Sequence, residues 1–132
     1  MNFGISQILI AEPDQDVNRT LKIYFETYGH TVESLDQLGE VISKARQWQP
    51  NAILISSEFT DADPHQVCQQ LLEERLTSHI PIIMMLHLDD RRAKLTALEA
   101  GVDDIVIKPL DIEELRLRVE AAIRLATMRM SP

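Results

Sequence analysis

The stretch LEAGVDDIVIKPL, at residues 98–110, decides the fold of this chain. Gly101 lies where a helix should end, because glycine readily takes the left-handed backbone conformation that closes many helices. The run Asp104–Ile107 then has the β-branched, largely apolar character of a strand. Lys108 and Pro109 follow directly, which places a charged side chain at the carboxyl end of that strand. A helix, a glycine and a strand in this order indicate the repeating unit of a parallel α/β sheet.

The same alternation extends back to the start of the chain. Apolar runs that indicate strands lie at residues 8–11, 31–35, 52–55 and 80–86. Apolar residues at helical spacing lie at residues 17–28, 38–48, 67–76, 93–100 and 115–126. Strands that alternate with helices imply right-handed crossovers and a parallel sheet. We therefore predict the α/β class, a flavodoxin-like doubly wound (βα)5 sandwich with a five-stranded parallel sheet in the order 2-1-3-4-5.

Composition indicates one soluble globular domain. The 132 residues are 45% hydrophobic and 26% charged, and the formal net charge of -8 disfavours direct binding to nucleic-acid phosphates. The single cysteine, Cys68, excludes an internal disulfide and suits a reducing compartment. The first residues lack a signal-peptide pattern, and no apolar run approaches the roughly 20 residues of a membrane helix. We expect a cytoplasmic protein that binds neither nucleic acid nor membrane.

Functional groups of a doubly wound sheet gather at the carboxyl ends of the strands, where the strand order reverses. In this chain those ends fall at residues 12–14, 56–58, 86–87 and 108–109. Acidic, hydroxyl and lysine side chains are among them. We therefore expect any functional site to lie at the carboxyl ends of the strands of the predicted sheet.

At these positions the chain resembles the receiver domain of two-component response regulators, from Ile8 to about Arg124. The resemblance is carried by ILIA at 8–11, PNAILI at 50–55, PIIM at 81–84 and, most specifically, the stretch at 98–110. It implies a domain that accepts a phosphoryl group on an aspartate after the third strand. It also implies an acidic pair after the first strand that helps to hold magnesium, a hydroxyl residue after the fourth, and a lysine after the fifth. An aromatic residue on the fifth strand often reports the switch.

This sequence departs from the family pattern at most of those positions. Counted without gaps, the phosphoacceptor position falls on Ser56, and the acidic pair falls on Glu12 and Pro13. The hydroxyl position falls on Leu86 and the aromatic switch position on Ile105. The positions that match well are Glu12, Lys108 and Pro109.

The departures weaken the expected metal site. Magnesium requires several hard oxygen ligands in near-octahedral geometry, and neither Pro13 nor Ser56 supplies a carboxylate. We therefore expect no cofactor, with Mg²⁺ needed only if the site is a divergent active one. A weak cation site formed by Glu12, Asp14 and Glu58 stays open as an alternative.

Ser56 does not simply replace an aspartate nucleophile, because a serine hydroxyl needs an adjacent base before it attacks well. Glu58 and His87 are the two candidate bases. We favour the interpretation that Ser56 is an ordinary polar residue at the end of a strand, so the chain has no catalytic residue and is not an enzyme.

Lys108 has a structural interpretation that needs no phosphate. A lysine near carboxylates is satisfied by them, so we expect an ion pair with Glu12, with Asp14, or with both. The resemblance also implies that Pro109 follows a cis peptide bond.

Three functions are consistent with these residues. The first is a pseudo-receiver that acts as a protein-interaction or dimerisation module without aspartyl phosphorylation. The second is a divergent receiver that is still phosphorylated. The third is a small-ligand sensor that uses the emptied acidic pocket.

The resemblance also implies partners. We expect a histidine kinase or another two-component protein, and a homodimer through the fourth and fifth helices, where Arg91, Arg92 and Lys94 form a basic cluster. A solvated helix face is the alternative for that cluster. Residues 1–126 are predicted to form the receiver-like domain, and residues 127–132 the start of a linker to a C-terminal output domain.

Overall fold

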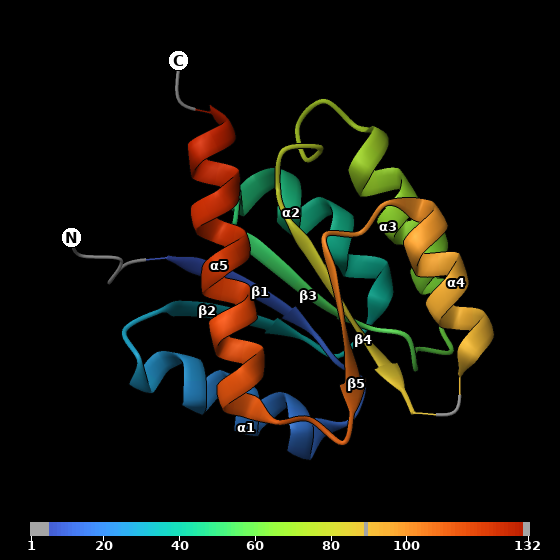
Figure 1. The fold of residues 1–132 in the computed structure, drawn as a ribbon, viewed down its shortest axis with the longest axis horizontal. Coiled ribbons are helices and arrows are strands. Elements are labelled where there is room, and N and C mark those ends of the chain that lie inside the picture. The colour runs from blue at the N-terminus through green and yellow to red at the C-terminus, as the bar shows by residue number, and fades with distance from the viewer. Residues whose placement is uncertain (1–5, 89, 131–132) are drawn as a thin grey trace.

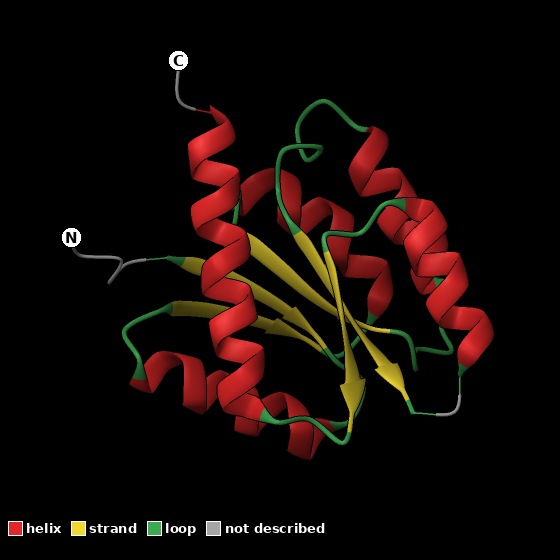
Figure 2. Ribbon diagram, in the orientation of Figure 1, coloured by secondary structure: helices red, strands yellow, loops and turns green. Residues whose placement is uncertain are grey.

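The computed structural model describes residues 6–88 and 90–130, in which five parallel strands form one sheet between two layers of helices (Figure 1, Figure 2). The strands are β1 (Gln7–Ala11), β2 (Thr31–Leu35), β3 (Ala52–Ser56), β4 (Ile82–His87) and β5 (Asp104–Lys108). The helices are α1 (Gln15–Thr27), a 3-10 turn η1 (Leu38–Glu40), α2 (Val41–Trp48), α3 (Pro64–Glu73), α4 (Arg91–Ala100) and α5 (Ile112–Met130).

The order of the strands in the sheet is β2-β1-β3-β4-β5, which confirms the predicted fold class. Each neighbouring pair is parallel, with Ile10 opposite Leu54 and Leu54 opposite Ile83 at the centre. All three of these side chains are fully buried. Central strands of a parallel sheet are covered on both faces, which explains why these strands are apolar without alternation.

Two separate cores lie on the two faces of the sheet. α1 and α5 cover one face, where Leu21 and Phe25 pack with Val119. α2, α3 and α4 cover the other, where Cys68 lies in the core. Burial is the main reason that the pKa of the Cys68 thiol is raised to about 12, with the charge of Asp63 adding to the effect. Cys68 is therefore a buried apolar residue.

Three helix ends are closed by local capping groups. Asp14 caps α1, because its side chain accepts hydrogen bonds from two backbone amides of the first turn. Asp111 caps α5 in the same way through the N–H of Glu114, at 3.1 Å. Gly101 ends α4 with a φ of 87°, in the left-handed region that glycine favours.

Two helix boundaries differ from prediction. α3 ends at Glu73, so Leu76, which was expected on its apolar face, lies in the following turn and is 60% exposed. α5 continues to Met130, beyond the predicted helical stretch at 115–126, so residues 127–130 are helical. Residues 131–132 lie outside the described residues, and the linker stays a prediction. None of the helices in the described ranges is long and apolar enough to span a membrane.

Candidate functional site

Glu12, Ser56 and Lys108 come together at the carboxyl ends of β1, β3 and β5. Glu12 immediately follows β1 and is fully buried. Its Oε1 accepts a hydrogen bond from Lys108 Nζ at 2.6 Å, and its Oε2 accepts one from the backbone N–H of Asp14 at 3.0 Å. A buried carboxylate must be paired and hydrogen-bonded, and Glu12 meets both conditions within the protein itself.

The Lys108 ammonium has three acceptors in this site. Besides Glu12, Nζ lies 3.4 Å from Ser56 Oγ and 3.4 Å from Glu58 Oε2. An ammonium has three N–H donors, so three acceptors satisfy it. The Lys108 side chain is only 13% exposed, whereas Glu58 is 36% exposed at the rim. The predicted ion pair therefore forms with Glu12 and extends to Glu58.

Asp14 takes no part in this pairing. Its carboxylate points to the N-terminus of α1, where Oδ1 accepts from the N–H of Asp16 at 3.0 Å and of Val17 at 3.2 Å. The alternative in which Lys108 pairs with Asp14 is wrong. The reason is that the first-turn amides of a helix are unpaired donors and attract a preceding carboxylate.

The residues present do not fit a magnesium ion. No group of three or more acidic, histidine or cysteine side chains with metal-binding geometry occurs within residues 6–88 and 90–130. Asp14 is committed to the helix cap, and the Lys108 ammonium already neutralises Glu12 and contacts Glu58. The alternative cation site at Glu12, Asp14 and Glu58 is thus not assembled in this structure.

Ser56 is fully buried at the end of β3. Its Oγ accepts a hydrogen bond from the Glu58 N–H at 3.1 Å and lies within bonding distance of Lys108 Nζ. Both partners are donors, so neither can remove the hydroxyl proton. Nucleophilic serines require such a base, and this environment is that of a structural hydroxyl.

Of the three substituted positions, Pro13, Leu86 and Ile105, the last two lie in strands and face apolar surroundings. Leu86 is fully buried in β4, and Ile105 in β5 is half-buried against the core on the α2, α3 and α4 face. Neither side chain carries a hydrogen-bonding group. The Lys108–Pro109 peptide bond is cis, as the resemblance implied.

One contact beside the site was missed from the sequence. Asp61, in the loop between β3 and α3, accepts hydrogen bonds from the backbone N–H of Leu38 at 3.3 Å and of Gly39 at 3.2 Å. This carboxylate ties the β3–α3 loop to the 3-10 turn that precedes α2. No spacing rule links residues so far apart in the sequence, so the sequence held no signal for it.

The fold is a doubly wound parallel sheet, with an acidic side chain after β1 and a lysine at the end of β5. The model of the response regulator receiver domain matches residues 8–120, and the chain belongs to this family.

Relatives of known sequence and structure agree with that assignment. The DNA-binding dual master transcriptional regulator RpaA of Synechocystis sp. is 30% identical over 89% of this chain and 49% of its own length. The transcriptional regulatory protein ResD of Bacillus subtilis is 29% identical over 92% of this chain and 50% of its own length. The chain therefore spans about half the length of these curated relatives. A putative response regulator from Chloroflexus aurantiacus superimposes with a TM-score of 0.85 at 25% identity, covering 90% of this chain and 98% of that one.

Proposed function

We propose that this receiver domain signals without phosphorylation of an aspartate, as a protein-interaction module of a cytoplasmic two-component pathway. The observation that carries the proposal is the pairing of Lys108 with the buried Glu12, beside a serine at the acceptor position. In the family pattern, the lysine meets an incoming phosphoryl charge. Here its charge is already neutralised by carboxylates of the same chain.

Electrostatics add a second argument for this proposal. A phosphoryl donor carries negative charge, and it would approach a site that presents the carboxylates of Glu12 and Glu58. Among the residues that the structure describes, Lys108 is the cation at this site that would offset that charge without bound magnesium. A donor would have to compete with Glu12 for the ammonium at 2.6 Å.

Exposure to a small phosphodonor tests the proposal. We expect no mass increase after incubation with acetyl phosphate and Mg²⁺, under conditions in which a known active receiver is fully modified. A stoichiometric adduct that hydroxylamine removes would contradict the proposal and indicate an acyl phosphate on a carboxylate such as Asp14, Glu58 or Asp61. An adduct at Ser56 that resists hydroxylamine would contradict it too, and would indicate serine chemistry.

The proposed interaction surface is the outer face of α4 and the neighbouring β5 and α5. α4 buries only its alanines, Ala93 and Ala97, while Leu95 and Leu98 are 51% and 57% exposed. An amphipathic helix normally buries its leucines. Exposed apolar residues that gather on one face favour a protein contact, and we propose that a second copy of this chain covers them.

Charge supports the choice of a second copy. The basic cluster of Arg91, Arg92 and Lys94 begins α4, and acidic Glu113 and Glu114 begin α5. A two-fold dimer can place the basic end of one α4 against the acidic end of the partner's α5. Complementary charges steer association and fix its register.

Replacing both leucines tests the dimer. In sedimentation equilibrium we expect the L95E/L98E variant to weaken dimerisation by at least about tenfold, because two charges would be buried in an apolar contact. The matched control is Leu76→Glu, which changes an equally exposed leucine in the α3–β4 turn and should leave dimerisation unchanged. A wild-type protein that stays monomeric at millimolar concentration would contradict the proposed dimer.

A histidine kinase or related two-component protein as partner, and a C-terminal output domain, stay part of this proposal. Two competing functions remain alternatives to it, the divergent phosphorylated receiver and the ligand sensor in the acidic pocket. The position of the Lys108 ammonium disfavours both competitors, because it occupies the space between Glu12 and Glu58 that either would use.

A further inference from the structure

β2 lies at one edge of the sheet, and within residues 6–88 and 90–130 no strand lies beside its outer backbone groups. Toward β1, Thr31 donates its N–H at 2.9 Å and the carbonyl of Leu35 accepts a hydrogen bond at 3.0 Å. Backbone groups of a parallel strand face alternate edges, so those of Val32 and Ser34 point outward. Such a row of unpaired donors and acceptors can template a further strand.

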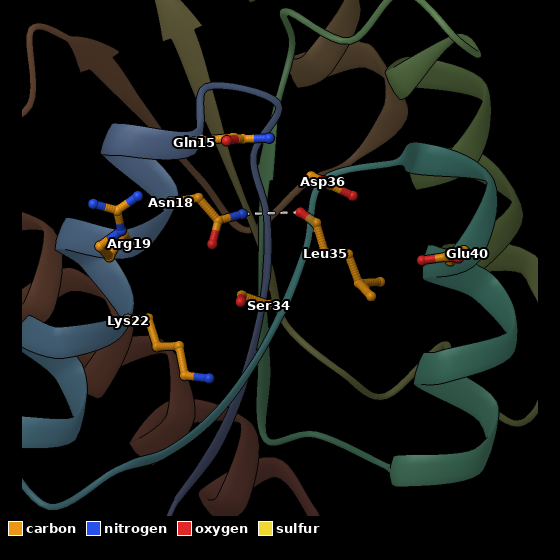
Figure 3. A pocket seen from close by; sticks show the side chains of 8 residues that line it. All are labelled: Gln15, Asn18, Arg19, Lys22, Ser34, Leu35, Asp36 and Glu40. Carbon is orange, nitrogen blue, oxygen red and sulfur yellow. Dashed lines mark hydrogen bonds between the residues drawn. The ribbon is translucent and has the colours of Figure 1, made fainter.

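A groove of about 330 Å³ lies at the carboxyl end of this edge (Figure 3). Arg19 and Lys22 of α1 line one side, and Asp36 and Glu40 line the other. In Figure 3, Lys22 reaches from α1 toward the strand that carries Ser34, and Glu40 points toward that strand from the opposite side. None of these four charged side chains forms an ion pair with another residue in the part of the chain that the structure describes. A cationic wall and an anionic wall thus flank an open strand edge.

We propose that this groove binds an extended peptide segment of a partner protein, which adds to β2 as a sixth strand. Successive side chains of a strand point to opposite faces. Acidic side chains of the segment would meet Arg19 and Lys22, and the intervening basic side chains would meet Asp36 and Glu40. Backbone hydrogen bonds to Val32 and Ser34 supply affinity that does not depend on sequence, and the two charged walls supply specificity.

The same charges argue against a second copy of this chain as the occupant. Antiparallel pairing of two β2 strands about a two-fold axis perpendicular to the sheet places α1 beside the α1 of the partner. Lys22 would then face its own equivalent, and Glu40 would do the same on the other side. Like charges in such positions are repulsive and select against the self-pair.

Two acetylated and amidated hexapeptides test the proposal, Thr-Glu-Lys-Glu-Lys-Thr and Thr-Asp-Arg-Asp-Arg-Thr. Binding is followed by amide chemical shifts and hydrogen exchange of the ¹⁵N-labelled chain. We expect at least one peptide to shift the amides of residues 32–36 and to slow exchange of the Ser34 amide by about tenfold or more. The control peptides carry N-methyl groups on two consecutive central backbone nitrogens, which removes one N–H donor from each edge of the peptide strand. These peptides should neither shift the amides of residues 32–36 nor slow exchange of the Ser34 amide.

Variants separate the backbone and charge contributions. Ser34→Pro removes only an outward N–H, because proline is tolerated on an edge strand where that donor faces solvent, and it should abolish binding with the fold retained. Lys22→Glu should weaken binding by about tenfold, whereas Arg75→Glu, in the α3–β4 turn away from the groove, should not. The proposal is overturned if neither peptide protects the Ser34 amide at millimolar concentration. It is also overturned if free lysine and glutamate alone shift the same amides, since the groove would then hold a small zwitterion.

Discussion

Replacing Lys108 with methionine is expected to lower the free energy of unfolding by about 3 to 5 kcal/mol. The loss arises from Glu12, which is fully buried and would keep only the N–H of Asp14 as a donor. Removing one member of a buried ion pair leaves an uncompensated charge out of water, and that cost exceeds the net value of the pair. Methionine keeps most of the apolar stem of lysine, so the change acts mainly on charge.

Urea unfolding followed by the fluorescence of Trp48, the only tryptophan, measures this effect. The matched control is Lys44→Met, which breaks a 3.4 Å pair with Glu33 in which both side chains are about a third or more exposed. Exposed pairs contribute about 0 to 1 kcal/mol. The double variant K108M/E12Q should recover much of the loss, because it removes both charges. Equal small losses for Lys108→Met and Lys44→Met would show that the buried pair does not hold the site together.

The sheet was predictable because burial dominates its sequence. β1, β3 and β4 are covered on both faces, which leaves short apolar runs whose length and β-branched residues favour strands. The helices gave a weaker signal. The leucines of α4 have helical spacing, yet the side that faces the sheet carries Ala93 and Ala97. Close packing of α4 on the sheet leaves room for small side chains there, and periodicity alone does not show which stripe is buried.

Two local features of the structure were also not predictable from the sequence. Tyr28 falls within the helical spacing of residues 17–28 but is 49% exposed, and its ring lies 3.9 Å from the guanidinium of Arg116. Gln49 ends α2 with a φ of 52°, although it is not a glycine. Its side-chain Nε2 donates to carbonyls of Ala45, Arg46 and Leu76, which stabilises a conformation that is otherwise unfavourable.

The site was predictable only in part. Strand topology brings the ends of β1, β3 and β5 together, so the pairing of Lys108 with Glu12 followed from the fold. The contact of Lys108 with Glu58 depends on the path of the loop after β3, and loop paths are not determined by strand order. The sequence also did not show whether Asp14 pairs with Lys108 or caps α1.

If missing carboxylates are what prevents phosphorylation, restoring them should create it. We expect the P13D/S56D variant to gain one hydroxylamine-labile phosphoryl group from acetyl phosphate in the presence of Mg²⁺, where the wild type gains none. Two added carboxylates beside Glu12 give the hard oxygen ligands that magnesium requires. Ser56 Oγ already lies 3.4 Å from Lys108 Nζ, so a carboxylate there has a cationic partner.

The expected reaction is a single phosphoryl transfer from acetyl phosphate to the protein. A carboxylate oxygen at position 56 attacks phosphorus, the bond from phosphorus to the acetate oxygen breaks, and acetate leaves with the electron pair. Intact mass before and after hydroxylamine records it. The matched control is P13D/S56N, which has nearly the same shape but an amide in place of the nucleophilic carboxylate, and it should stay unmodified. A folded P13D/S56D protein that also stays unmodified at saturating Mg²⁺ would mean that the missing carboxylates are not the obstacle. The buried Lys108–Glu12 pair, or Leu86 in place of a hydroxyl, would then be what prevents transfer, and adding Leu86→Thr to the variant would distinguish these two.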